Sequence, residues 1–87
     1  MANTRDNNVI ALDSTGAISG DVWRIKSFHY VGASSGSVIL RSPDGSGKVV
    51  YEASGASDNS LDVGNLHVIG DLHVTVANGA KLYIYLK

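Results

Sequence analysis

Short runs of β-branched and aromatic residues, broken at close intervals by turn residues, are the feature that most constrains the fold of this chain. Gly and Ser supply 21 of the 87 residues and cluster between the runs. The Pro-Asp-Gly-Ser-Gly segment at 43–47 and the Asn78-Gly79 pair are strong turn signals. No segment has helical periodicity. The pattern is typical of an all-β sandwich or barrel.

We expect seven or eight short strands in a small antiparallel β-sandwich of jelly-roll type, with a small closed β-barrel as the alternative. Residues 43–47 and 77–80 are predicted to be hairpin turns, and residues 54–64 a polar loop. Residues 9–87 are expected to form a single domain, preceded by a polar N-terminal arm at residues 1–8. The predicted strands are 9–14, 21–31, 37–42, 48–53, 65–69, 71–76 and 81–86.

Side-chain alternation in the last strand separates a core face from an outward face, because successive residues of a strand point to opposite sides. Leu82, Ile84 and Leu86 share one parity and are assigned to the core. Tyr83 and Tyr85 share the other parity and are predicted to point outward. Outward tyrosines suit a subunit contact or stacking on a sugar, because the ring is apolar and its hydroxyl is polar. Alternatively, the two tyrosines cover neighbouring side chains of the same subunit and contact no partner.

The strand at 21–31 changes parity at Ser27. Trp23 and Ile25 share one parity, whereas Phe28 and Tyr30, which follow Ser27, share the other. A β-bulge near Ser27 would turn both sets toward one core. Alternatively, both faces of the strand are covered, one of them by another subunit. The sequence leaves this choice open.

A domain of this size has a thin core and gains from association. We therefore expect a homo-oligomer, with a trimer favoured over other states. The residues expected at its interface are Trp23, Phe28, Tyr30, Tyr83 and Tyr85.

Composition argues against several function classes. The net charge is −1 with the charges scattered, so we expect no nucleic-acid partner. The chain has no cysteine, which removes thiol catalysis and thiolate metal sites. There is neither an apolar run of membrane-spanning length nor the apolar core of a signal peptide, so we expect no membrane association and no ordinary secretion.

No catalytic, cofactor or metal site is expected. The Gly-Ala-Ser-Ser-Gly segment at 32–36 only approximates a nucleophile elbow and lies in a predicted turn. Residues 42–47 lack the lysine of a phosphate loop, and residues 58–62 have too few acidic ligands for calcium. His67 and His73 would face opposite sides of a hairpin with a two-residue turn at Gly70-Asp71. An odd turn or a bulge would reopen a shared metal site.

Three segments together resemble the small β-sandwich decoration, or cement, proteins of tailed bacteriophages. They are GDVWRIKSFHYVG at 20–32, GSVILRSPDGSGKVVYEASG at 36–55 and GDLHVTVANGAKLYIYLK at 70–87. The resemblance implies a non-enzymatic virion structural protein without a cofactor. Its implied partner is the major capsid protein or another virion protein, and its implied location is the virion, assembled in the host cytoplasm.

A carbohydrate-binding or other adhesive β-sandwich module is the alternative function. Trp23, Tyr30, Tyr83 and Tyr85 would then form the stacking platform. An outward row of these rings beside Asp or Asn would favour this alternative, whereas rings buried in a core would oppose it. An accessory domain of an enzyme complex is a third possibility, but the chain offers no residues for a polar pocket.

Overall fold

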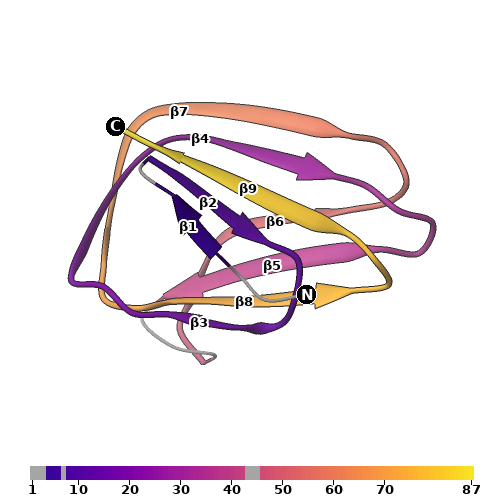
Figure 1. Ribbon diagram of the computed structural model, residues 1–87, viewed down its shortest axis with the longest axis horizontal. Coiled ribbons are helices and arrows are strands. Elements are labelled where there is room, and N and C mark those ends of the chain that lie inside the picture. Colours follow the sequence, from indigo (N-terminus) through magenta and orange to yellow (C-terminus); the bar gives the residue numbers. More distant parts are fainter. Residues whose placement is uncertain (1–3, 7, 43–45) are drawn as a thin grey trace.

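The computed structural model describes residues 4–6, 8–42 and 46–87 as two antiparallel sheets packed face to face (Figure 1). The five-stranded sheet has the strand order β1-β2-β9-β4-β7, and the four-stranded sheet has the order β3-β8-β5-β6. None of the described segments is a helix that could cross a membrane. The strands are β1 (Thr4–Asp6), β2 (Val9–Leu12), β3 (Gly16–Ile18), β4 (Val22–Val31), β5 (Ser37–Ser42), β6 (Lys48–Ser54), β7 (Asn59–Ile69), β8 (Leu72–Ala77) and β9 (Lys81–Leu86).

The strand order is that of a jelly roll with one additional N-terminal strand. From β2 onward the chain alternates between the sheets at every connection except that between β5 and β6, which pair directly. This produces the two interleaved four-strand layers of the jelly roll, β2-β9-β4-β7 and β3-β8-β5-β6. The predicted sandwich of jelly-roll type is confirmed. The two sheets are separate, so the alternative of a closed barrel is not realised.

Three short segments depart from the predicted boundaries. Gly16–Ile18, which lies outside the predicted strands, is strand β3 and pairs with β8. Strand β7 begins at Asn59, inside the predicted polar loop. Thr4–Asp6, from the expected polar arm, forms edge strand β1 and pairs with β2. In each case a backbone partner from elsewhere in the chain stabilises a strand that local composition does not favour.

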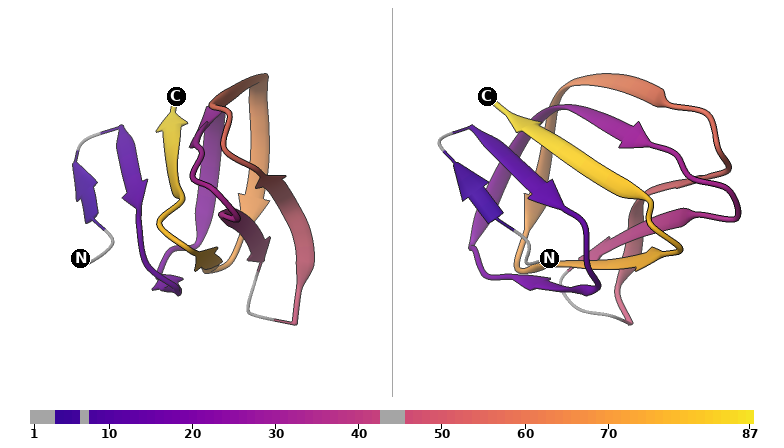
Figure 2. Two further views of the ribbon diagram at one scale, coloured as in Figure 1. Left: turned by 90° about the vertical axis from the view of Figure 1, so that its right-hand side faces the viewer. Right: turned by 45° about the vertical axis from the view of Figure 1, so that its right-hand side comes forward.

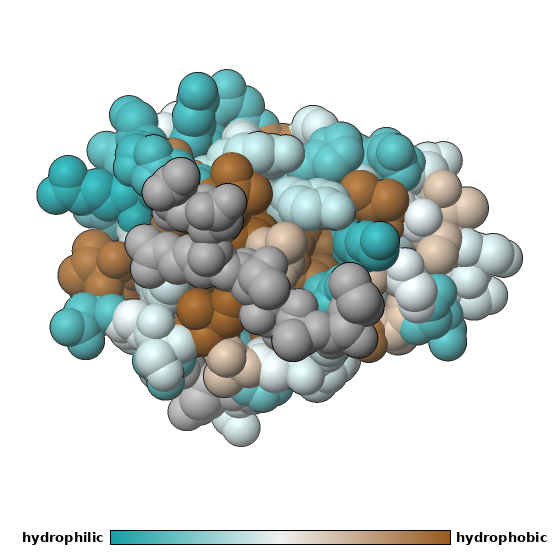
Figure 3. All heavy atoms as spheres, in the orientation of Figure 1, coloured by the Kyte–Doolittle hydropathy of each residue, from teal (hydrophilic) through white to brown (hydrophobic). Residues whose placement is uncertain are grey.

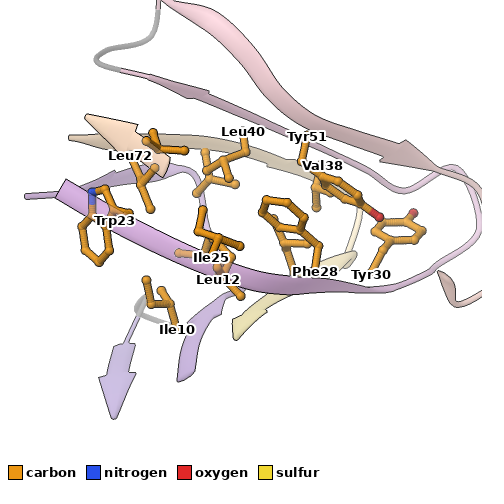
Figure 4. Close-up of a cluster of buried hydrophobic side chains, with 14 of the residues drawn as sticks. Ile10, Leu12, Trp23, Ile25, Phe28, Tyr30, Val38, Leu40, Tyr51 and Leu72 are labelled. Carbon is orange, nitrogen blue, oxygen red and sulfur yellow. The ribbon is translucent and has the colours of Figure 1, made fainter. Parts of the chain in front are cut away.

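A β-bulge resolves the change of parity in β4. The pairing of β4 with both of its neighbours shifts register between Ile25 and Ser27. Trp23 and Ile25 on one side of the shift, and Phe28 and Tyr30 on the other, are all at most 2% exposed. Figure 4 shows them between the two sheets, facing Val38, Leu40 and Tyr51 of the opposite sheet. The first of the two sequence explanations is therefore confirmed.

The predicted hairpin turn at 77–80 and the turn considered at Gly70-Asp71 are both corners that lead from one sheet to the other. Gly70 and Asp71 connect β7 of the five-stranded sheet to β8 of the four-stranded sheet, and residues 78–80 lead back to β9. Asn78 and Gly79 have φ of 56° and 84°, as a type I′ turn requires, and the Ala80 N–H donates to the Ala77 carbonyl. The turn chemistry was predicted correctly, but the pairing of the flanking strands was wrong.

The β5–β6 hairpin is the predicted turn that stays within one sheet. Its strands pair from Ser37 opposite Ser54 to Ser42 opposite Lys48. Residues 43–45 at its tip, in the Pro-Asp-Gly segment, lie outside the described residues.

The sheet edges differ in length on the two sides of the sandwich. On one side the edge strands are β1 and β3, each three residues long. On the other side they are β6 with seven residues and β7 with eleven. The left view of Figure 2 separates the N-terminal strands, in indigo, from β6, in rose, at the opposite side of the molecule. The long edges leave more unpaired backbone groups available to a partner.

Candidate functional site

Three of the five residues predicted at a subunit interface lie in the core instead, so that part of the prediction is wrong. Trp23, Phe28 and Tyr30 are 2%, 1% and 0% exposed. The bulge in β4 turns them inward, where they contact the opposite sheet instead of another subunit. Burial of Trp23 and Tyr30 also removes them from any sugar-stacking platform. With both parities of β4 facing one core, this strand no longer indicates a subunit contact.

Tyr83 and Tyr85 are the two aromatic side chains that point away from the core. Both lie on β9, where Leu82, Ile84 and Leu86 are buried as predicted. Tyr85 is 38% exposed and Tyr83 is half-buried. Since the other four aromatic residues of the chain are buried, the outer face of the five-stranded sheet carries all of its accessible aromatic surface.

Strand register places polar side chains in line with the two tyrosines. Tyr83 lies opposite His29, and His29 lies opposite Ser60 on the edge strand β7. His29 Nδ1 and Ser60 Oγ are 2.6 Å apart, a hydrogen bond that holds the imidazole against the sheet. The His29 and Tyr83 ring centroids are 6.4 Å apart with the planes tilted by 37°. We call this set, with Tyr85, the tyrosine face.

A second row runs parallel to the first, with Tyr85 opposite Ser27 and Ser27 opposite Asp62. The tyrosine face thus has two rings on β9 and hydroxyl, imidazole and carboxylate groups toward β7. It lies on the outside of a sheet, which suits a broad partner surface or a stacked planar ligand. The contact between His29 and Ser60 is exposed on this surface.

The view in Figure 3 looks onto the side of the molecule where β1, β2 and β9 lie in front. Among the coloured atoms, apolar residues appear there in several patches, some beside hydrophilic residues and some beside the grey atoms. Exposed apolar residues of this kind are normal for a protein surface.

The histidines do not converge on a metal site. His67 lies on β7, opposite Arg24, whereas His73 lies on β8 in the other sheet, opposite Arg41. The connection between these strands is the two-residue segment Gly70-Asp71, so its length is even. Within the ranges that the structure describes, no three or more His, Cys, Asp or Glu residues are placed to hold a metal ion.

A groove between the two long edge strands was not predicted. It has a volume of about 320 Å³ and lies between the start of β6 and the end of β7. The sequence signal for this groove is the irregular spacing of apolar and polar residues along β7, which departs from regular strand alternation. Its lining residues are Ser42, Lys48, Val49, Val50, Leu66, His67, Val68 and Ile69.

Comparison with known proteins gives little guidance to the role of these surfaces. No protein-family model matches the chain, and no curated protein matches it. Among solved structures, it is similar to a fucose binding module of Streptococcus pneumoniae, SpX-3. The identity is 14%, the TM-score is 0.43, and the match covers 91% of this chain and 72% of that one. We carry no residue or ligand over from a likeness this distant.

Proposed function

We propose that this chain is a non-enzymatic structural subunit of a tailed-phage virion that binds the major capsid protein or another virion protein. The resemblance of residues 20–32, 36–55 and 70–87 to phage decoration proteins supports the proposal. The observation that carries it is the tyrosine face, where a small sandwich leaves its two accessible aromatic rings on one rigid strand. Tyrosines with a polar surround are typical of protein contact surfaces.

The proposed contact uses Tyr83 and Tyr85 as its anchors and the polar residues toward β7 as its rim. The hydrogen bond between His29 and Ser60 fixes the rim before the partner arrives. Because β9 is paired on both sides, the two rings are held by a central strand of the sheet. Such preorganisation lowers the entropy that binding must overcome.

The test is quantitative mass spectrometry of gradient-purified particles of the phage or prophage whose genome encodes the chain. A fixed copy number relative to the major capsid protein supports the proposal. Recovery of the chain only from the soluble fraction overturns it.

The surface is tested by adding purified protein to particles that lack the chain. The Tyr83→Ala/Tyr85→Ala variant should bind at least about tenfold more weakly, because an interface tyrosine often contributes 2 kcal/mol or more. Thr75→Ala, an exposed position on the other sheet, is the matched control and should bind as the unchanged protein does. Equal binding by the tyrosine variant would contradict a contact through this face.

A carbohydrate-binding module is the second candidate, favoured by one observation. Tyr83 and Tyr85 are two residues apart on one strand. Ser60 lies in the same row of the sheet as Tyr83, and Asp62 lies in the same row as Tyr85. Calorimetry with a panel of neutral oligosaccharides tests it. Saturable binding that is lost in Tyr83→Ala and kept in Tyr83→Phe would support stacking. No heat of binding across the panel would eliminate this candidate.

A further inference from the structure

We propose that two copies of this chain pair through the free edges of their β7 strands, forming a two-fold dimer with one continuous sheet. β7 is the longest strand of the protein, lies at the edge of the five-stranded sheet and has exposed apolar side chains. Leu61 is 48% and Ile69 is 75% exposed. Long, partly apolar edge strands are the usual site of strand addition.

The groove beside the second half of β7 has one sign of charge. Lys48 and His67 are its basic residues, and no carboxylate is among its described lining residues. The first half of β7 carries the opposite sign, since Asp62 lies there on the outward face opposite Ser27. One end of the strand therefore complements the other end, as an isologous contact requires.

The β-bulge in β7 allows this complementarity to repeat on both sides of a two-fold axis. Between Asp62 and Leu66 the strand contains three residues opposite the single Lys26 of β4. Asp62 and His67 would point to opposite faces of a regular strand, but the bulge puts both on the outer face. An axis at Gly64-Asn65 then pairs Asp62 of each copy with His67 of the other.

The same register matches the inward-facing side chains. It places Leu61 of one copy beside Val68 of the other, and Val63 beside Leu66. Leu61 and Val68 both face the core side, because they lie opposite Phe28 and Trp23. Each copy would thus lay the Leu61-Asp62-Val63 segment beside the second half of its partner's β7, with Asp62 on the outer face in the row that holds His67 and Arg24.

Backbone groups are available at this edge. The Gly70 N–H donates to the Asp21 carbonyl, and antiparallel alternation then directs the backbone groups of His67 away from β4. The Ile69 carbonyl accepts a hydrogen bond from Ser42 Oγ at 3.0 Å, which marks the end of the available edge. Edge bulges commonly discourage pairing. Here the bulge lies on the proposed axis, and the flanking segments 60–63 and 66–69 form the seam.

Analytical ultracentrifugation of the full chain tests the dimer over a concentration series. We expect a monomer–dimer equilibrium, and Leu61→Lys and Ile69→Lys should each raise the dissociation constant at least about tenfold. Thr75→Lys is the charge-matched control on the other sheet and should leave the constant unchanged. Thermal unfolding of each variant verifies that the fold is intact. A monomer at every concentration, or a dimer insensitive to both β7 variants, would overturn the proposal.

Disulfide cross-linking tests the register, since the unchanged chain has no cysteine. When Asp62→Cys and His67→Cys proteins are mixed and oxidised, the expected product is a disulfide between the two, whereas a mixture of Asp62→Cys with Thr75→Cys should give none. Equal cross-linking in the two mixtures, or none in the first, would overturn this register. The dimer does not depend on the two tyrosine rings of β9, so Tyr83→Ala/Tyr85→Ala should dimerise normally. Loss of the dimer in that variant would instead place self-association on the tyrosine face.

Discussion

The rings of Phe28 and Tyr51 stack across the interior of the sandwich, with centroids 4.6 Å apart and planes 18° from parallel. Phe28 belongs to β4 of one sheet and Tyr51 to β6 of the other, so the pair joins the two layers. The Tyr51 hydroxyl is buried and lacks a hydrogen-bond partner in the part of the chain that the structure describes. Nearby, the Tyr30 hydroxyl donates to the Gly55 carbonyl at 2.7 Å.

Tyr51→Phe should raise the free energy of unfolding by about 1 kcal/mol, because it removes an unsatisfied buried hydroxyl and keeps the stacked ring. Tyr30→Phe is the matched control and should lower that free energy by about 1 kcal/mol, since it removes a hydroxyl that is hydrogen-bonded. Urea denaturation of the three proteins measures both changes. Equal losses in the two variants would show that the Tyr51 hydroxyl is satisfied.

Alkaline pH should destabilise the protein partly through Tyr51. Burial, and secondarily the charge of Tyr30, raises the pKa of Tyr51 above its ordinary value of 10.0. Below pH 10 the phenol is neutral in the folded and unfolded states, and its contribution is fully present. As the pH rises further, the unfolded state ionises first, and folding loses up to about 1.4 kcal/mol per pH unit from this group.

Tyr51→Phe should therefore lose less stability than the unchanged protein as the pH rises above about 10. Urea denaturation at a series of alkaline pH values measures the difference. Parallel curves for the two proteins would contradict a raised pKa at this position.

Trp23→Phe should lower the free energy of unfolding by about 2 kcal/mol, because it leaves a small cavity and removes a hydrogen bond. The Trp23 indole N–H donates to the Gly70 carbonyl at 2.8 Å, tying the start of β4 to the β7–β8 corner. Val22→Ala is the neighbouring control at a 58% exposed position and should change the free energy by less than about 0.5 kcal/mol. Denaturation followed by circular dichroism reports on each variant. Comparable losses for the two would refute this role.

Asn78 supports the β8–β9 corner in two separable ways. Its φ is 56°, and its side-chain amide donates to the Ser35 carbonyl at 2.7 Å. Asn78→Gly should cost about 1 kcal/mol through loss of the hydrogen bond. Asn78→Ala should cost about 1–2 kcal/mol more, because alanine is strained at positive φ. Thermal unfolding ranks the variants, and a glycine variant no more stable than the alanine variant would argue against the strain.

Periodicity and turn chemistry predicted the local structure well. The inward face of β9 and the positive φ at Asn78-Gly79 follow from two-residue alternation and from the few residues that accept a left-handed backbone. The bulge near Ser27 was one of two alternatives that the change of parity left open. Of the candidate site, only Tyr83 and Tyr85 were placed correctly on the outside. Trp23, Phe28 and Tyr30 could not be assigned until the bulge was known to turn both halves of β4 inward.

The sequence by itself determined most of the strands, the core face of β9 and where the chain reverses direction, because these depend on contacts within a few residues. Only the tertiary structure decided which strands pair. The turns at Gly70 and Asn78 reverse the chain equally well within one sheet or between two. Connections between the two sheets are selected because they bury the apolar face of each sheet against the other. The same connections place β6 and β7 side by side as open edges with a groove between them.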